Sequence, residues 1–599
     1  MSHPESPSPD APGRPGVRHV LRAFLDRGPE RSFLVGLVVV GILVFLPAIR
    51  SPLLFDDYIH RSMANGTFPA PRGPFDFYDF VNGHDRALLL ERGIVPWWTD
   101  PALEIRFFRP LSSLLLYGDH RTFASAPLVL HVHSFLWWVL AVLGARALFV
   151  RYFSPRVALF ATAAFALAPA HVLPLAWLAN REALVSLALG LVALVRYEDF
   201  RDEARPKDAV LATLLFALAF LAGEYALLLG GYVVAFEVFR PKGPSTSLGR
   251  RVAGLAPFVV PLVAYLVARR ALGYGTTASG FYSDPTRDPL GFLAAAPKRL
   301  SWLVLGAWLA LDGEAMRPSY SAVALVLAAV ALLVFVRPAV LAAIRALDDL
   351  PRRRAMALGS GSLLSLVPVL SVQPSPRLLE AALVGVAAIV ALVVDHAFFT
   401  ERTAGPFPKG ERAAQVALLF LFAHFVEAPI VSRTHARTVQ RVGMRFAYYA
   451  GKFSERLGDP EKARVIVLRD SGSAFYLPFA LGPTGAPPRS WRVLAHTGHV
   501  LTLRDGDTSF SLNVGKDSTV FPLGHGNLFR KDEARLPVGS VVTIPGLTAH
   551  VLEANASGPT AVRFVFDGPL DDAVFVSETQ KGFRIETLPD PGFGAPFDP

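Results

Sequence analysis

The chain has 599 residues, of which 52% are hydrophobic and only 18% are charged, and its mean hydropathy is +0.39. Soluble proteins carry roughly 25% charged residues, and here the deficit is concentrated in long apolar runs, which excludes an ordinary soluble enzyme and indicates a polytopic membrane protein. The absence of cysteine excludes disulfides, thiolate nucleophiles and cysteine-ligated metals, and the net charge of +10 is spread between the apolar runs, which favours membrane orientation over nucleic-acid binding.

The N-terminal residues 1–31 are rich in Pro, Ser, Gly and Arg, and an apolar run at 33–49 follows them. We predict a disordered cytoplasmic tail over 1–31 and a retained first span, because the charged leader is long and no small-residue cleavage site follows the run. Ten further apolar runs bring the predicted spans to about eleven within a transmembrane domain at 32–431. They lie at 127–150, 157–175, 178–195, 209–222, 225–239, 252–268, 319–336, 355–372, 378–396 and 413–431.

Basic residues gather in alternate connections between the predicted spans, at 151–156, 196–207, 240–251, 337–354 and 402–412. Cytoplasmic connections carry an excess of Lys and Arg, so we predict a multi-pass protein of the inner (plasma) membrane with a cytoplasmic N-terminus. This topology requires that the apolar segment 298–312 does not cross the membrane. Its roughly 15 apolar residues fall short of the roughly 20 that a span needs, and we expect an interfacial or re-entrant segment there.

In this orientation a first outer loop at about 50–126 and the C-terminal region 432–599 both lie outside the cytoplasm. The C-terminal region consists of short β-branched or alternating runs, separated by Gly, Asp, Asn and Pro, which predicts an extracytoplasmic antiparallel all-β domain. The runs lie at 464–468, 500–503, 509–514, 540–544 and 561–566.

Asp56 and Asp57 open the first outer loop directly after the first span. Adjacent carboxylates at a membrane boundary suit general-base catalysis, because one raises the pKa of the other, and they also suit a divalent cation; a solvated pair at a helix end is the alternative. Near the end of the loop, Arg109 offers a partner to these carboxylates or to a lipid phosphate, unless it only snorkels to the headgroups. His131 and His133 have no third ligand at a fixed spacing, so no metal site is predicted there.

Three ionisable residues, His171, Arg181 and Glu182, belong to the outer hairpin between the third and fourth predicted spans. Ionisable side chains at a membrane face are expensive unless they line a wet cavity, so the hairpin is a candidate binding site. Trp177 in the same hairpin suits an interface anchor or a substrate platform equally.

Two further outer positions carry isolated charges. Glu224 lies between the fifth and sixth predicted spans and needs a cationic partner, for which Arg181 and Arg109 are the candidates on that side. Arg377 presents a cation where an anionic headgroup would approach, and snorkelling again accounts for it equally well.

The order of these motifs resembles the GT-C membrane glycosyltransferases, and it is most similar to the transmembrane and tetratricopeptide-repeat O-mannosyltransferases and their bacterial relatives. The resemblance covers roughly residues 33–396, and the repeats of that branch are not present. Ser134, Trp138, Gly223 and Leu378 differ from the pattern of the family. The motifs that carry the resemblance are Asp56 with Asp57, the segment Phe107–Ser113, the hairpin Pro169–Arg181 with its Pro-x-His and Ala-Trp-Leu-x-x-Arg, the lone Glu224, and Arg377.

Members of that superfamily take a sugar from a polyprenyl-phosphate carrier at the outer membrane face and pass it to a protein, lipid or glycan acceptor. The resemblance implies that Asp56 or Asp57 is the catalytic base. It also implies a substrate site, which we assign to Arg109, His171, Arg181, Glu182, Glu224 and Arg377. No cofactor is indicated, and a divalent cation at the acidic pair stays open.

The leading hypothesis is therefore an inverting, hexosyl- or mannosyl-transferase-like membrane glycosyltransferase. Its expected partners are a polyprenyl-phosphate-linked sugar, membrane lipids and a protein or glycan acceptor, and not nucleic acid. The alternative is a non-catalytic, membrane-anchored envelope protein whose C-terminal β-domain binds glycan or protein. A transporter is disfavoured, because the candidate charges lie at the outer face rather than at the bilayer midplane.

Overall fold

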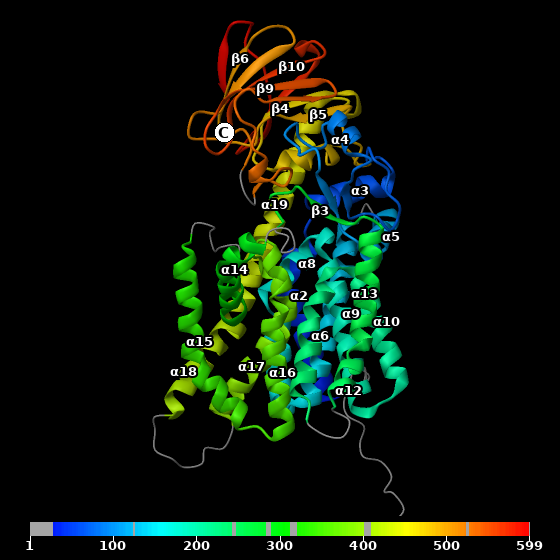
Figure 1. The fold of residues 1–599 in the computed structure, drawn as a ribbon, viewed down its shortest axis with the longest axis vertical. Helices are drawn as coiled ribbons and strands as arrows, with labels where there is room; N and C mark the ends of the chain where they lie inside the picture. Colours follow the sequence, from blue (N-terminus) through cyan, green and yellow to red (C-terminus); the bar gives the residue numbers. More distant parts are fainter. Residues whose placement is uncertain are drawn as a thin grey trace, which may run out of the picture.

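The computed structural model describes residues 28–123, 126–241, 247–282, 289–311, 320–399, 409–522 and 526–597. A helical bundle forms one end of the molecule and a β-domain the other, with the first loop of the chain between them (Figure 1). We call the end of the bundle that carries the β-domain the domain end, and the opposite end the far end. Most of the predicted tail 1–31, with parts of the basic connections at 242–246 and 402–408, lies outside the described residues.

The bundle confirms the prediction of a polytopic helical membrane protein. Among the described residues, seven helices are long and apolar enough to cross a membrane, and two bent pairs, α7 with α8 and α12 with α13, raise the number to nine. The bounds are α2 Pro29–Ile49, α6 Pro127–Tyr152, α7 Pro155–Ala166, α8 Val172–Ala176, α9 Glu182–Glu203, α10 Pro206–Ala222, α11 Gly230–Phe239, α12 Leu248–Gly254, α13 Ala256–Ala271, α14 Pro289–Leu309, α15 Ala322–Arg345, α16 Asp349–Ser365, α17 Glu380–Phe398, α18 Lys409–Leu421 and α19 Ala428–Leu457.

Two of the predicted spans, 209–222 and 225–239, form helices that are too short to cross alone. α10 has 17 residues, and α11 has 10 residues after a six-residue 3-10 segment at Glu224–Leu229, whereas a span needs roughly 20. The piece expected at 298–312 overlaps α14. Lys298 and Arg299 follow Pro297 in the middle of this helix, and it is not among the seven.

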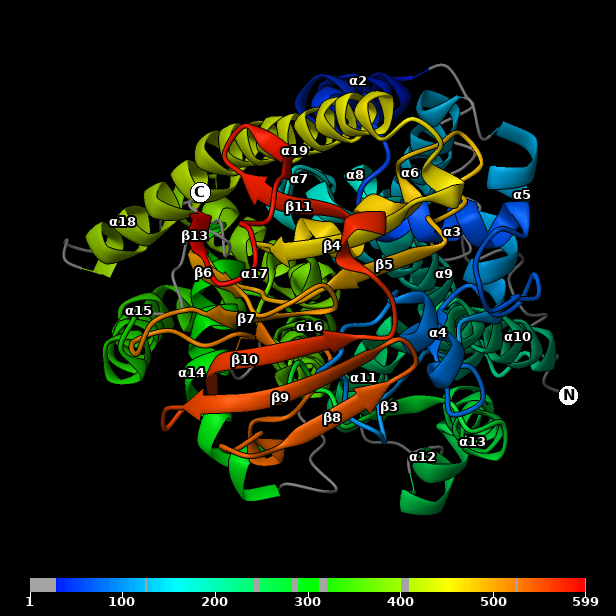
Figure 2. The ribbon, with the colours of Figure 1, turned by 90° about the horizontal axis from the view of Figure 1, so that it is seen from above.

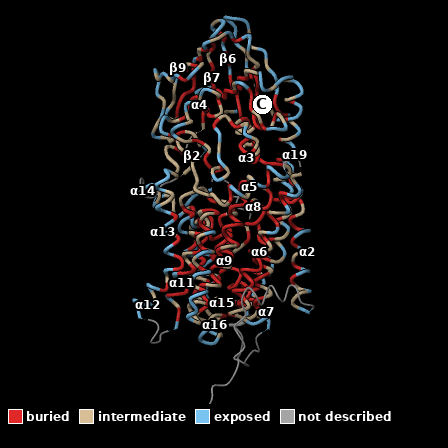
Figure 3. Tube along the Cα trace, turned by 90° about the vertical axis from the view of Figure 1, so that its right-hand side faces the viewer, coloured by how far each residue is buried: buried red, intermediate tan, exposed pale blue. Residues whose placement is uncertain are grey.

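Helix α9 lies among the buried segments of the bundle (Figure 3), and α17 is buried to a similar degree. Their apolar stretches are 89% and 94% buried, whereas that of the peripheral α15 is 28% buried. Small residues on α17 let its neighbours approach closely, since a Cβ atom at Gly385 would lie 2.1 Å from the Leu358 carbonyl oxygen of α16.

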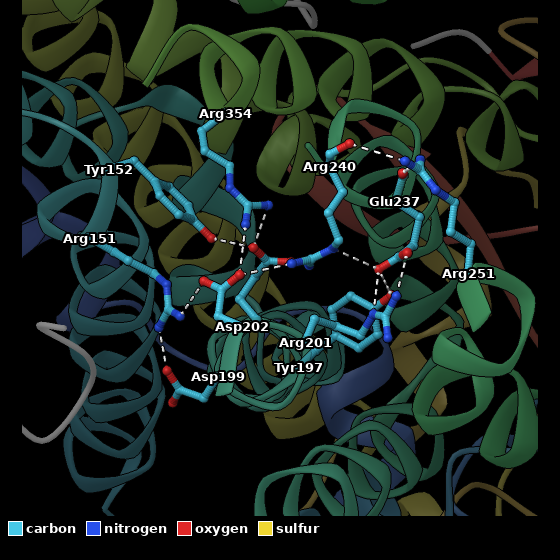
Figure 4. Close-up of polar contacts among 11 residues, drawn as sticks. Arg151, Tyr152, Tyr197, Asp199, Arg201, Asp202, Glu237, Arg240, Arg251 and Arg354 are labelled. Carbon is cyan, nitrogen blue, oxygen red and sulfur yellow. Dashed lines mark hydrogen bonds and ion pairs between the residues drawn. The ribbon is translucent and has the colours of Figure 1, made fainter. Parts of the chain in front are cut away.

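Buried ion pairs join the far ends of α6, α9, α11 and α16 into one network (Figure 4). Arg240 is its most connected cation, with ion pairs to Glu198 at 2.6 Å, to Asp202 at 2.8 Å and to Glu237 at 3.2 Å. Arg354 pairs with the same Glu198 at 2.5 Å. Four helices that are distant in sequence are thereby tied together at the end that carries the basic connections.

The β-domain contains two sheets, and the predicted C-terminal β-domain is confirmed. A six-stranded antiparallel sheet has the order β13-β6-β7-β10-β9-β8, and a four-stranded sheet has the order β12-β11-β4-β5. The expectation of purely antiparallel pairing is wrong for the second sheet, because long connections let β4 pair in parallel with both β5 and β11. The strands are β4 Arg464–Arg469, β5 Ser490–Val493, β6 Val500–Arg504, β7 Ser509–Asn513, β8 Val541–Ile544, β9 Leu547–Ala554, β10 Pro559–Phe566, β11 Val574–Thr579, β12 Gly582–Glu586 and β13 Gly594–Phe597.

The first outer loop shares one hydrophobic core with the β-domain. Trp97 donates a hydrogen bond to the Leu494 carbonyl at 2.9 Å, and Arg530 donates one to the Trp98 carbonyl at 2.5 Å. We call the loop and the β-domain together the outer module. The loop elements are α3 Asp56–Asn65, β1 Asp79–Val81, α4 Arg86–Arg92, β2 Glu104–Arg106 and α5 Pro110–Phe123, and β3 Gly275–Thr277 extends their small sheet.

Candidate active site

A cleft of about 1360 Å³ lies between the domain end of the bundle and the outer module. Five of the predicted site residues line it, and these are Asp56, Arg109, Glu182, Glu224 and Arg377. Three others, Asp57, His171 and Arg181, are buried outside this lining. The structure thus divides the predicted set into a group that faces the cleft and a group that supports its walls.

A sharp turn sends the two neighbouring aspartates in different directions. Phe55 has φ 38° and ψ −105°, a conformation that a residue with a Cβ atom rarely adopts, and α3 begins at the next residue. The Phe55 ring is held between Trp177 at 6.1 Å and Tyr476 at 5.1 Å, measured between ring centroids. Since successive helical residues point about 100° apart, Asp56 lines the cleft and Asp57 is turned into the protein.

Asp57 connects α3 to the hairpin before α9. Its carboxylate accepts hydrogen bonds from the backbone N–H groups of Ala179 at 2.8 Å, Leu54 at 2.9 Å and Leu178 at 3.4 Å. An acceptor already occupied by three backbone donors is suited to holding the turn, and it is poorly placed to meet a substrate.

Burial raises the pKa of both Asp56 and Asp57 to about 7, but only Asp56 lines the cleft, so Asp56 is the candidate base. The positive charge of Arg377 opposes part of the shift at Asp56. A carboxylate that ionises near neutral pH is both available and basic enough to take a proton from a hydroxyl group.

Arg109, one of the two predicted candidates, is the cation that pairs with Glu224. Its Nε lies 2.7 Å from Glu224 Oε2, and its Nη1 lies 3.1 Å from Glu182 Oε1. The guanidinium also stacks 4.9 Å from the Tyr78 ring centroid. One cation therefore holds two carboxylates on the bundle wall, and Arg109 has little positive charge left for a ligand phosphate.

Arg377, Arg269 and Arg270 supply positive charge to the cleft. The Arg377 guanidinium lies 5.7 Å from the Trp177 ring centroid, so the same indole ring that packs on Phe55 also positions this arginine. Among the described residues, no ion pair neutralises any of the three. Arg269 and Arg270 were not predicted, although a basic pair at the outer end of a span, against the orientation bias, was a usable signal.

His171 and Arg181 support the hairpin from behind. His171 Nδ1 lies 3.0 Å from Glu380 Oε1 at the start of α17. Arg181 pairs with Asp119 and donates to the Ser134 hydroxyl at 2.8 Å. Ser134, which differs from the family pattern, is therefore a partner of Arg181, and the predicted pairing of Arg181 with Glu224 does not occur.

The β-domain supplies the wall that lies opposite the bundle, and sequence reasoning missed its polar residues. His496 lines the cleft, and its Nδ1 lies 3.2 Å from Asp470 Oδ2. Burial opposes ionisation of Asp470, but hydrogen bonds from His496 and Glu578 lower its pKa overall, whereas burial and Asp470 raise the pKa of Glu578. Burial raises the pKa of Tyr476, and the negative charges of Asp56 and Asp470 both add to this increase. Tyr476 is therefore close to the carboxylates of both walls of the cleft.

A shared cation at Asp56 and Asp57 does not fit this arrangement. Both oxygens of Asp57 accept hydrogen bonds from backbone N–H groups, so Asp57 does not share a ligand with Asp56. Two other carboxylates that line the cleft, Glu182 and Glu224, are paired with Arg109. Within the described part of the chain, no group of three or more His, Asp or Glu side chains gathers with metal-binding geometry.

No protein-family model matches the chain, and no curated protein is similar to it in sequence. Solved structures resemble it at low identity. The oligosaccharyltransferase of Archaeoglobus fulgidus, crystallised with a tethered acceptor peptide, has a TM-score of 0.41 at 14% identity and matches 79% of this chain but only 64% of its own length. ArnT from Cupriavidus metallidurans has a TM-score of 0.40 at 16% identity, over 76% of this chain and 85% of its own.

The arabinofuranosyltransferase AftD from Mycobacteria has a TM-score of 0.32 at 14% identity, over 73% of this chain and 29% of its own. These three proteins are GT-C glycosyltransferases, the superfamily that the motif order resembles. The chain spans less than two thirds of the length of the oligosaccharyltransferase and less than one third of AftD. At these identities no residue role passes from one protein to another.

Proposed function

We propose that this chain is an inverting glycosyltransferase that moves a sugar from a polyprenyl-phosphate donor to a hydroxyl group of a protein, lipid or glycan acceptor, at the outer face of the inner membrane. The observation that carries the proposal is the position of Asp56, whose carboxylate has a pKa of about 7 and lies on the wall of a large cleft within the field of Arg377. Hexosyl and mannosyl donors are the first candidates.

The reaction needs one base and one cluster of cations. The acceptor hydroxyl gives its proton to the Asp56 carboxylate while its oxygen attacks the anomeric carbon of the sugar. The bond from that carbon to the phosphate oxygen breaks, and its electron pair stays on the phosphate. Arg377, with Arg269 and Arg270, is placed to stabilise the negative charge that develops there.

The acceptor is proposed to lie against the β-domain wall. With the Nδ1–H of His496 donating to Asp470, the other ring nitrogen is a hydrogen-bond acceptor suited to a hydroxyl group. The shared core of the outer module holds this wall over Asp56, since Phe55 and Tyr476 are in ring contact. A domain that is only tethered to the membrane by an anchor would not need these contacts with the first loop.

Incubation of the purified full chain in lipid nanodiscs with a panel of radiolabelled polyprenyl-phosphate sugars and envelope extract tests the function. We expect label from one donor to move to an acceptor. Saturable donor binding without any transfer would instead support the non-catalytic alternative.

The pH dependence of transfer is expected to report Asp56. A base with a pKa of about 7 is protonated below that pH, so kcat/KM should fall about tenfold per pH unit below 7 and level off above it. Initial rates between pH 5 and 9 check this, provided that donor binding is measured separately at each pH. A flat profile across this range would contradict a role for Asp56 as the base.

Replacing His496 by glutamine is expected to raise the KM for the acceptor about tenfold, with a much smaller change in kcat, because one hydrogen bond to the acceptor is lost. The KM for the donor should stay constant. His550→Gln on β9 is the matched control, since His550 is not among the residues that line the cleft. An unchanged acceptor KM in His496→Gln would remove His496 from the acceptor site.

A further inference from the structure

Helix α19 connects the bundle to the β-domain along one side of the molecule. It runs 30 residues from Ala428 to Leu457, beside α2, and the first strand of the β-domain begins at Arg464 (Figure 2). One side of this helix packs on the protein through residues such as Gly443, Phe446 and Ala450. The opposite side is exposed and belongs to neither the cleft nor the shared core.

The exposed side of α19 is strongly cationic. Arg433, Arg437, Arg441 and Arg445 follow one another at four-residue intervals, which places them on one face of the helix. The helix has no Asp or Glu between its start and Glu455. Arg437, Arg441 and Arg445 are exposed, and no carboxylate of the described residues forms an ion pair with them.

Two hydrogen bonds locate these arginines relative to the domain end of α2. Arg433 donates to the Leu43 carbonyl within α2, and Gln440 donates to the Arg50 carbonyl at its end at 3.1 Å. At about 1.5 Å per residue, Arg437 to Arg445 cover about 12 Å of helix axis, and this stretch crosses the level at which α2 ends. That level is where the headgroup region of a bilayer meets the protein.

Exposed apolar side chains accompany the arginines. Val442, Met444 and Tyr448 are exposed on the same stretch of α19. Met444 and Arg50 also line a small groove of about 350 Å³ with Leu128. Apolar side chains that alternate with cations suit a surface that offers acyl chains and phosphates together.

Membrane orientation does not account for these charges. In the proposed orientation the domain end faces away from the cytoplasm, where the bias toward Lys and Arg predicts few cations. We propose that Arg437, Arg441 and Arg445 form a binding surface for the phosphate groups of anionic phospholipid headgroups, which holds α19 and the outer module at a fixed depth in the membrane. This proposal does not depend on the glycosyltransferase activity.

Native mass spectrometry of the full chain, released from nanodiscs with equal amounts of phosphatidylglycerol and phosphatidylcholine, tests the proposal. The wild-type protein should retain phosphatidylglycerol in preference to phosphatidylcholine. Since each arginine near an anionic surface is worth about fivefold in binding, Arg437→Gln/Arg441→Gln/Arg445→Gln should reduce this preference at least about tenfold. In wild type, 0.5 M salt should reduce it as well.

Two further variants serve as controls. Arg489→Gln/Lys516→Gln/Arg563→Gln removes the same charge from the β-domain and should keep the lipid preference. The charge-conserving Arg437→Lys/Arg441→Lys/Arg445→Lys should keep most of it, which separates charge from misfolding. Equal preference in wild type and the glutamine triple variant would overturn the proposal. Tight binding of polyglutamate without any preference for phosphatidylglycerol would overturn it in favour of an acidic protein partner.

Discussion

Asp56→Asn is expected to reduce sugar transfer by at least about 10³-fold while the protein folds normally, because the amide keeps the shape of the side chain but cannot take a proton. The folded-state pKa of Asp56 is raised from 3.8 to about 7, so the stability that its protonated form contributes is lost as the pH rises through that interval. At pH 8 the neutral asparagine should therefore leave the thermal unfolding midpoint equal to or above that of wild type. Transfer assays and unfolding curves on the same preparations check both parts.

Asp57→Asn is the matched control at the neighbouring position. An asparagine has one acceptor oxygen where Asp57 uses two, and its NH₂ group would face a backbone N–H. We expect a loss of about 1–3 kcal/mol in stability, visible as a lower unfolding midpoint. The assignment of the base to Asp56 fails if Asp57→Asn abolishes turnover at full stability while Asp56→Asn remains active.

Arg240→Met is expected to destabilise the far end of the bundle by about 3–5 kcal/mol, because removing one partner of a buried ion pair leaves the other charges uncompensated. Arg240 is buried, and its loss would leave Glu198, Asp202 and Glu237 sharing fewer cations (Figure 4). Equilibrium unfolding in detergent micelles measures the change.

Arg205→Met provides the comparison for this network. Arg205 forms an ion pair of 2.6 Å with Glu203 near the same end, but its side chain is 56% exposed, and exposed pairs contribute about 0–1 kcal/mol. Equal and small effects of the two substitutions would mean that the network contributes little to stability. A large loss of stability in Arg240→Met alone would show that the ion-pair network stabilises the packing of the four helices.

The apolar runs predicted the architecture because a span is defined by local composition. The limits of this signal appear at 209–239, where two predicted spans became the 17-residue α10 and the 10-residue α11. In the β-domain, the five predicted runs all became strands, but β5, β9, β11, β12 and β13 were missed. Four of these strands, all except β9, have only four to six residues. The parallel pairing of β4 depends on segments that are distant in sequence, which period-two patterns do not encode.

The site was predictable only in part, for physical reasons that differ between residues. Asp56 and Arg377 stand at the outer ends of apolar runs, where an ionisable residue attracts notice. Arg181 was a candidate partner for Glu224 because both lie on the same side of the predicted membrane. It forms an ion pair with Asp119 instead, a residue that belongs to no recognisable motif. His496 comes to the cleft only through the packing of the outer module, and no local pattern marks it.

The shared core of the outer module also sets the order of events during synthesis. Trp97 and its partner Leu494 are separated by 397 residues, which a ribosome needs about 20–80 s to add at about 5–20 residues per second. In the proposed orientation, the first loop has already crossed the membrane during this time, while the strands that cover its tryptophans have not been made. We therefore expect the cleft to be the last part of the protein to form, and the first loop to depend on chaperones on that side of the membrane until the chain is finished.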